Sequence, residues 1–210
     1  SKVWNKKIFK NIQEKVDAAS VSLAEERGAC PDAAEYGMKE RFSNKTAIAP
    51  TASISIICGG SSPGIEPIAA NSYTHKTLSG SFNVRNKYLK KLLQKHNKDT
   101  DDVWSSITTN QGSVSHLDFL TAEEKDTFKT AFEIDQRWVV ELGADRTPHI
   151  SQAQSVNIFI PADIHKKDLH DLHFQAWKKG LKSLYYCRSK SIQRAENVNN
   201  TSQTDVTKNV

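Results

Sequence analysis

Two short segments of the sequence combine residue types that could do chemistry, and the first is rich in small hydroxyl residues. It consists of Pro50, Thr51, Ala52, Ser53, Ile54 and Ser55. Successive backbone N–H groups and hydroxyl donors form concave arrays that bind phosphate oxygens, especially where a helix N-terminus follows. No lysine follows at the spacing of a nucleoside-triphosphatase phosphate loop. An ordinary Ser/Thr-rich turn has the same composition, so the segment alone favours a turn and leaves an anion site open.

The second segment is a pair of adjacent tyrosines, Tyr185 and Tyr186. The reference pKa of tyrosine is about 10, so each phenol keeps its proton at neutral pH unless it is oxidised. Neighbouring phenols at the end of a buried strand could therefore pass an electron while each loses its proton to a nearby acceptor. Tyrosine is also common in ordinary strands, where adjacent side chains point to opposite faces. On its own, the pair favours an ordinary strand.

Three histidines and one cysteine are weaker candidates. His170 and His173 lie three apart on a predicted helix that also carries His165, but no Glu-x-x-His pair accompanies them as a metal site requires. We expect a solvated helix face there and no metal. Cys58 precedes two glycines and could be a nucleophile. No partner for it can be identified, so we expect a buried, inert thiol.

The composition favours a folded protein with a mixed surface. Of the 210 residues, 37% are hydrophobic and 25% are charged, which is enough for a packed core. The 29 basic and 24 acidic residues give a net charge of +5 but are largely interleaved, as is typical of a solvated surface. The basic stretch Lys87–Lys98 keeps one alternative open, a non-catalytic module that binds nucleotides or nucleic acid.

Cysteine use and hydropathy bear on the compartment. Cys30, Cys58 and Cys187 are odd in number and far apart, with no CxxC pair, which favours a reducing compartment over a disulfide or zinc framework. The sequence has no long apolar run, and its first residues lack the apolar core of a secretory signal. We therefore expect a cytoplasmic protein that does not enter a membrane.

Hydrophobic periodicity and capping residues place these candidates on an alternation of helices and strands. We expect helices over residues 3–27, 85–98, 122–142 and 163–180, short strands over 46–50, 155–161 and 184–187, and β-like runs over 72–84. Thr121 and Glu124 form a capping box for the third helix, and Gly143 is its expected end. Residues 51–67 are expected to form a loop and not a helix. The alternation indicates an α/β protein.

Several motifs follow the hydroxyl-rich segment in a fixed order. They are Ser-Pro-Gly-Ile-Glu-Pro at residues 62–67, Leu-Ser-Gly at 78–80, Asn-Gln-Gly-Ser at 110–113, Ser-Gln-Ala-Gln-Ser-Val-Asn at 151–157 and Ala-Trp-Lys-Lys-Gly-Leu-Lys-Ser-Leu-Tyr-Tyr at 176–186. In this order the chain, from about residue 20 to about residue 195, resembles the large catalytic subunits of ribonucleotide reductases. The paired tyrosines favour class I, whose radical arrives from a separate subunit.

The resemblance implies a fold and a division of the chain. The family builds a ten-stranded α/β barrel from two five-stranded halves, and this chain resembles the second half with a small inserted α/β region. Residues 1–70 would form the first part of the barrel half with the phosphate loop, residues 71–150 the inserted region and a helix, and residues 151–190 the last strands. Residues 191–210 would form a flexible tail.

The resemblance also implies a reaction and a set of partners. The family reduces ribonucleotides to 2′-deoxyribonucleotides by radical chemistry, and most class I members use diphosphates. Residues 50–55 would hold the substrate phosphates, while Tyr185 and Tyr186 would relay oxidising equivalents to an active-site cysteine. No cofactor is expected in this chain, since the dimetal–tyrosyl radical centre belongs to the small subunit. The expected partners are that small subunit, the N-terminal half of the large subunit, a ribonucleoside diphosphate, and thioredoxin or glutaredoxin as the reductant, with no nucleic acid.

The sequence departs from the family pattern in its cysteines. The family's radical cysteine lies in an Asn-x-Cys-x-Glu pattern, which does not occur here, and Cys30, Cys58 and Cys187 do not match the cysteines that reduce the substrate. Residues 188–210 also lack the tail cysteine pair. The resemblance therefore implies that the chain is incomplete on its own and needs an N-terminal polypeptide, which is also expected to carry the effector site.

Overall fold

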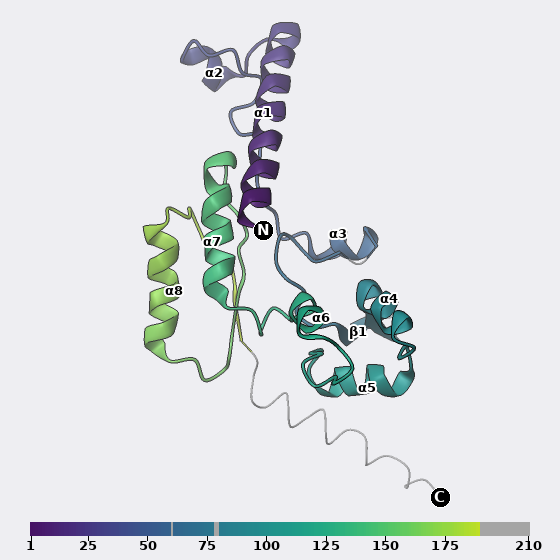
Figure 1. Cartoon of the computed structure of the whole chain (residues 1–210). Helices are drawn as coiled ribbons and strands as arrows, with labels where there is room; N and C mark the ends of the chain where they lie inside the picture. The colour runs from purple at the N-terminus through teal and green to yellow at the C-terminus, as the bar shows by residue number, and fades with distance from the viewer. Residues whose placement is uncertain (60, 78–79, 190–210) are drawn as a thin grey trace, which may run out of the picture.

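A computed structural model describes residues 1–59, 61–77 and 80–189, so the predicted flexible tail lies outside the described residues. A long helix, α1 (Lys2–Arg27), leads into the short helices α2 (Pro31–Glu35) and α3 (Ala52–Ile57). Figure 1 shows α7 (Gln136–Arg146) and α8 (Lys166–Lys178) lying side by side, while α4 (Lys87–Lys95), α5 (Asp101–Thr109) and α6 (Ala122–Thr127) gather in a second group. No helix among the described residues is long and apolar enough to span a membrane.

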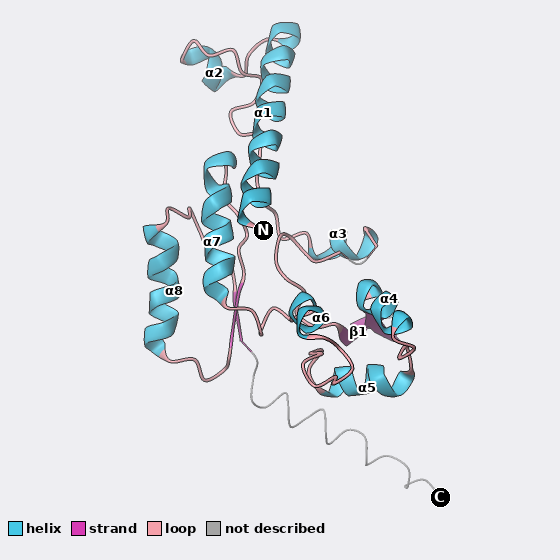
Figure 2. Ribbon diagram, in the orientation of Figure 1, coloured by secondary structure: helices cyan, strands magenta, loops and turns pink. Residues whose placement is uncertain are grey.

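Three short parallel segments lie at the centre of the structure. Strand β3 (Ile158–Ile160) pairs in parallel with β4 (Cys187–Ser189), and both are short magenta segments in Figure 2. On the other edge of the β3 segment, Ile48 forms an isolated parallel bridge with Gln154. The strand expected at 155–161 is confirmed in part, and the one at 46–50 is reduced to this bridge. Parallel segments flanked by helices confirm the α/β class, although the described residues form no closed barrel.

One hydrophobic core joins α7, α8 and β3. Its buried residues are Val140, Ile158, Leu172 and Ala176. The expected helix end at Gly143 is wrong, because α7 continues through it to Arg146. A Cβ at Gly143 would lie 3.2 Å from the Leu181 side chain, so the glycine permits a close approach of the chain that follows α8. It is a packing residue and not a helix stop.

The buried Arg146 fastens α1 and α7 to the central segment. Its Nε donates to Gln154 Oε1 at 3.0 Å, and its Nη1 donates to Asn5 Oδ1 at 3.3 Å. Burial lowers the pKa of Arg146 to about 10, which leaves the side chain charged at neutral pH. Asn5 in turn donates to Leu142 O at 3.0 Å, so α1 is held along α7 by polar as well as apolar contacts. The helix expected over residues 3–27 is confirmed.

The single helix expected over residues 122–142 is wrong, because the chain leaves the helical path between α6 and α7. The capping box at Thr121 and Glu124 is confirmed, with both reciprocal hydrogen bonds present. Thr130 donates through both its N–H and its hydroxyl to Glu133 Oε2 at 2.8 Å. Asp135 then accepts from Arg137 N and begins α7. These side chains compete with the helical backbone for hydrogen bonds, which apolar periodicity does not register.

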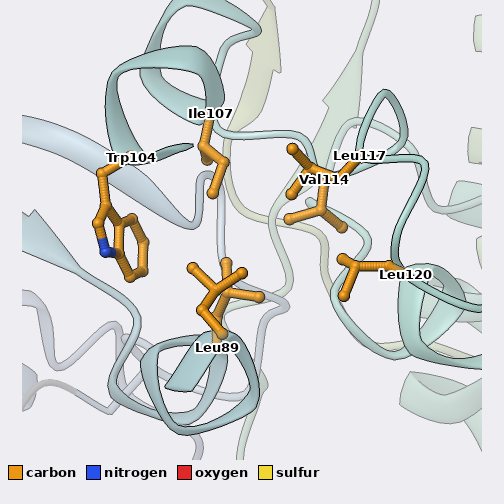
Figure 3. Close-up of a cluster of buried hydrophobic side chains, with 7 residues drawn as sticks. Leu89, Trp104, Ile107, Val114, Leu117 and Leu120 are labelled. Atoms are coloured by element: carbon orange, nitrogen blue, oxygen red, sulfur yellow. The ribbon is translucent and has the colours of Figure 1, made fainter. Parts of the chain in front are cut away.

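A second core lies under a β-hairpin. Strands β1 (Ser72–Thr77) and β2 (Gly80–Arg85) pair antiparallel, which confirms the expected β-like runs. Figure 3 shows the side chains of α4, α5 and the following loop converging on one another. The buried residues are Leu89, Leu93, Trp104, Ile107, Val114, Leu117 and Leu120. Helix α5 was not expected, although its Thr100 cap and the two aspartates in its first turn are ordinary helix-start signals.

Asn71 ties this second core together. It is 3% exposed, and its Nδ2 donates to Phe128 O at 2.7 Å and to Gly112 O at 3.0 Å. Its Oδ1 accepts from Asn86 Nδ2 at 2.8 Å. The side chain therefore joins the start of the hairpin to α4, to the turn after α5 and to the chain after α6.

Candidate functional site

The two predicted relay tyrosines lie against each other. The ring centroids of Tyr185 and Tyr186 are 4.1 Å apart with an interplanar angle of 51°, and the Arg188 guanidinium lies 5.6 Å from the Tyr186 ring. A hydrogen bond between the phenols raises the pKa of Tyr185, and Arg188 opposes this shift. Tyr185 therefore stays protonated at neutral pH, so it can lose its proton only together with an electron. An ordinary strand, with the two side chains on opposite faces, does not describe this geometry.

The hydroxyl-rich segment begins a helix, which corrects the expectation of a loop over residues 51–67. Thr51 adopts a left-handed conformation with φ 48° and ψ 30°, and α3 follows it directly. The Thr51 Oγ1 accepts from Gly64 N at 2.6 Å, so the loop of residues 61–67 folds back over the helix start. The Ser55 hydroxyl donates to Ala52 O at 2.7 Å, which satisfies that buried hydroxyl within the helix.

The exposure of the segment decides which of its groups a ligand could reach. Pro50, Ala52, Ser53 and Ile54 are exposed, Thr51 is half-buried, and Ser55 is buried. The first N–H groups of an α-helix have no acceptor within the helix, so the backbone of residues 52–54 presents donors toward solvent beside the Ser53 hydroxyl. Ser55 is instead buried, and its hydroxyl is bonded to Ala52 O within the helix. The segment can bind an anion through its backbone and Ser53.

Hydrogen bonds connect this segment to the tyrosine pair. Asn157 donates through Nδ2 to Glu66 Oε2 at 2.5 Å, and its Oδ1 accepts from Tyr186 N at 3.0 Å. Glu66 belongs to the same loop as Gly64, which holds Thr51. The polar chain thus runs from the helix start, through the loop, to the tyrosine backbone.

An open cavity of about 630 Å³ lies along the same path. It is lined by residues 47–49, immediately before Pro50, by residues 152–155 and by residues 183–185. Tyr185 therefore lies in the wall of this hollow, whereas residues 50–55 follow the lining residue Ala49 in the chain and are not themselves part of the lining. A substrate-sized molecule has room there, since ligand cavities usually span several hundred Å³.

A slightly larger cavity, of about 680 Å³, lies between α1, α7 and the 43–46 segment and contains none of the predicted site residues. Its basic groups already have partners. Lys45 pairs with Asp17 at 2.6 Å and with Glu40 at 3.1 Å, and Lys182 donates to three backbone carbonyls. With its cations occupied, this cavity is a poor site for an anion.

The weaker candidates resolve differently. His165 caps α8 by accepting from Lys167 N, and His173 contacts Leu169 O, as expected of a solvated helix face. Among the described residues, no cluster of His, Cys, Asp or Glu could hold a metal. The expected burial of Cys58 is wrong, because the thiol is exposed at the end of α3, where the short helix leaves its last residues in solvent.

Glu66 and Asn157 were not singled out from the sequence. Both lie inside the motifs that carry the resemblance, at residues 62–67 and 151–157. Their position inside these motifs was the only sign in the sequence that they could belong to the site. Their contact joins residues 91 positions apart, which no local pattern can reveal.

Comparison with known proteins gives the family. The sequence profile described as "Ribonucleotide reductase, barrel domain" matches residues 32–187. The chain therefore belongs to the ribonucleotide reductase barrel-domain family. It is 48% identical over 195 residues to the ribonucleoside-diphosphate reductase large subunit of Invertebrate iridescent virus 6, covering 91% of this chain and 20% of that protein. The corresponding large subunit of Invertebrate iridescent virus 3 is 46% identical over 203 residues, covering 95% of this chain and 32% of that protein.

A solved structure agrees. The class Id ribonucleotide reductase alpha subunit of Actinobacillus ureae matches with a TM-score of 0.83 at 39% identity, covering 93% of this chain and 35% of that one. The chain thus spans between a fifth and about a third of the length of these proteins. The matches favour the reductase interpretation over a basic nucleotide- or nucleic-acid-binding module.

Proposed function

We propose that the chain forms the part of a ribonucleotide reductase large subunit that holds the substrate phosphates and carries the final tyrosines of the radical relay. The observation that carries the proposal is the contact between the Tyr185 and Tyr186 rings, 4.1 Å apart, with Tyr185 in the wall of a cavity also lined by residues 47–49. Residues 1–70 and 151–190 would belong to the second half of the family's ten-stranded barrel, with residues 71–150 inserted.

The phosphates of a ribonucleoside diphosphate would bind at the start of α3. The backbone N–H groups of Ala52, Ser53 and Ile54 and the Ser53 hydroxyl supply donors, since phosphate oxygens are strong acceptors. Pro50 directs the chain into the left-handed Thr51, which the Gly64 N–H holds in place. Ser55, whose hydroxyl donates to Ala52 O, would complete the phosphate-binding segment from within the helix.

The tyrosine pair would pass a hydrogen atom equivalent. Once Tyr186 has lost an electron and its proton to the upstream oxidant, its neutral radical takes an electron and a proton from the adjacent Tyr185 phenol, whose ring it contacts. Tyr186 is restored, and Tyr185 carries the radical. Tyr185 then takes an electron and a proton from a cysteine thiol, which becomes the thiyl radical that begins substrate reduction.

The remaining components would come from other polypeptide segments. The thiyl-forming cysteine and the substrate-reducing cysteines belong to the part of the large subunit not represented here. The oxidant would come from a small subunit with a dimetal–tyrosyl radical centre, and thioredoxin or glutaredoxin would restore the cysteines after each turnover.

Phenylalanine substitution in the assembled reductase tests the proposal. Tyr185→Phe keeps the ring but removes the O–H that must give up its hydrogen, so turnover should fall by at least about 10³-fold while nucleotide affinity stays unchanged. Tyr88→Phe, at an exposed tyrosine on α4, is the matched control and should leave turnover intact. Normal turnover by the Tyr185→Phe enzyme would overturn the relay role. Separately, Ser53→Ala should weaken nucleotide binding by about fivefold through the loss of one hydrogen bond.

A further inference from the structure

The backbone pairing becomes irregular at the two tyrosines. The parallel register pairs Ile158 with Cys187, and Ile158 N donates to Tyr186 O at 3.0 Å. If this register continued toward the N-terminal end, the Tyr186 N–H would donate to Val156 O. Tyr185 N occupies that acceptor instead, at 2.8 Å. Immediately before β3 and β4, two residues of one segment therefore stand opposite one residue of its neighbour, which is the arrangement of a β-bulge.

The bulge leaves the Tyr186 N–H without its ladder acceptor, and Asn157 replaces it. The Asn157 Oδ1 accepts from Tyr186 N at 3.0 Å. Asn157 is the residue opposite the bulge and is only 5% exposed, so water does not serve the same purpose. A buried N–H without a partner is costly, which makes this side-chain acceptor part of the bulge itself.

Glu66 fixes which way the Asn157 carboxamide points. The Nδ2 donates to Glu66 Oε2 at 2.5 Å. An ionised carboxylate only accepts hydrogen bonds, so it selects the NH₂ end of the carboxamide and turns the oxygen toward Tyr186. The carboxylate comes from the loop that also holds Thr51, and it thereby links the phosphate segment to the bulge.

The bulge explains why the tyrosine rings meet. In a regular strand, successive side chains point to opposite faces, and two adjacent phenols would be held apart. An extra residue breaks this alternation and re-aims a side chain. The 4.1 Å separation of the Tyr185 and Tyr186 ring centroids is the outcome.

We infer that Asn157 is a positioning residue that builds the bulge and so holds Tyr185 and Tyr186 in contact, with Glu66 orienting its carboxamide. The consequence for radical transfer rests on the proposed function, whereas the geometry does not.

Exchanging the hydrogen-bond donor and acceptor between Asn157 and Glu66, in the 210-residue chain, tests whether this pair holds the tyrosine rings together. Asn157→Asp keeps an acceptor for Tyr186 but faces a second carboxylate, so like charges should drive the pair apart. Adding Glu66→Gln restores the bond with reversed polarity, because the glutamine amide donates to the new carboxylate. Glu66→Gln alone should be neutral, since its oxygen still accepts from Asn157. Asn157→Ala removes both bonds.

The measurements are the nuclear Overhauser contact between the two tyrosine rings and the hydrogen exchange of the Tyr186 amide. Asn157→Ala and Asn157→Asp should lose the ring contact and exchange this amide about fivefold to tenfold faster, and the double variant should recover both. Unchanged exchange at Leu89 and Leu93, in the separate core under the hairpin, verifies that each variant is folded. A retained ring contact in Asn157→Ala, or failure of the double variant to recover it, overturns the inference.

Turnover of the assembled reductase separates this inference from the proposed function. With Asn157→Ala, kcat should fall at least about tenfold while nucleotide affinity changes little, because the lost geometry lies in the relay. Normal kcat in a variant whose ring contact is lost would overturn the relay role of the tyrosines and leave the positioning role standing.

Discussion

Replacing Asn71 with alanine should loosen the core under the hairpin without touching the candidate site. The Asn71 side chain makes three hydrogen bonds, one buried and two partly buried, but its loss does not leave every partner unpaired. Gly112 O keeps a second donor, because Asn71 N also donates to it at 3.1 Å. Phe128 O and Asn86 Nδ2 lose the partner that Asn71 gave them. At roughly 1 kcal/mol for a net hydrogen bond and 1–3 kcal/mol for an orphaned buried group, the free energy of unfolding should fall by about 3 kcal/mol.

Urea unfolding followed by circular dichroism measures the change, and hydrogen exchange locates it. Exchange should accelerate at Leu89 and Leu93 and stay unchanged at Ile158, which belongs to the other core. Asn83→Ala removes an exposed asparagine of the same hairpin and should stay within about 0.5 kcal/mol of the parent chain. If Asn71→Ala lowers the free energy of unfolding by less than about 0.5 kcal/mol, the reasoning is wrong. Such a result would mean that water bonds to Phe128 O and Asn86 Nδ2 in the variant.

Three further outcomes follow from the packing and the capping contacts. Gly112→Ala should destabilise by more than about 2 kcal/mol in urea unfolding, because its φ of 82° disfavours a side chain and the new Cβ would lie 2.4 Å from a neighbouring Cβ. Gly143→Ala should cost less, about 1 kcal/mol by the same assay, since helical φ suits alanine and the leucine side chain it meets at 3.2 Å can shift. The hydrogen bond from His96, and after it the one from Thr121 N, holds the pKa of Glu124 below its usual value. The ionised carboxylate therefore stabilises the fold above the unfolded pKa near 4.5. This stabilisation is lost as the pH falls through the pKa of the folded state. Glu124→Gln should lower the urea midpoint at neutral pH, where the carboxylate contributes, and flatten its pH dependence below about pH 4.5.

Features carried by a few neighbouring residues could be predicted from the sequence. The Thr121 capping box needs only residues three apart, and the hairpin over residues 72–85 needs only local alternation and a glycine. Helices α1 and α8 also followed from their periodicity, with their ends shifted by up to a few residues. In these cases the local hydrogen bonds and the tertiary packing favour the same conformation.

The errors arose where a distant segment decides the local conformation. Gly143 reads as a helix stop, but it lies inside the helix, where the chain beyond α8 approaches so closely that a Cβ would meet the Leu181 side chain at 3.2 Å. Residues 128–135 read as helical by their apolar spacing, but Thr130 and Asp135 place their hydrogen bonds elsewhere. The strand at 46–50 is a single bridge, because its pairing depends on residues about 100 positions away.

The candidate site contains two backbone irregularities that local sequence patterns do not predict, one at Thr51 and one at Tyr186. Each is stabilised by a hydrogen bond with a residue distant in the sequence. Thr51 is β-branched yet left-handed, a conformation that costs roughly 1–2 kcal/mol, and a backbone N–H from Gly64 stabilises it. Tyr186 gives up its ladder acceptor, and Asn157 supplies another. Each irregularity places a group that a regular element would misplace. In one case it is the start of α3, where we propose that phosphate binds, and in the other it is a phenol. Because Glu66 and Gly64 belong to one loop, that loop stabilises both irregularities. Strain and its compensation therefore coincide with the proposed chemistry, as expected where geometry is maintained for function and not for stability.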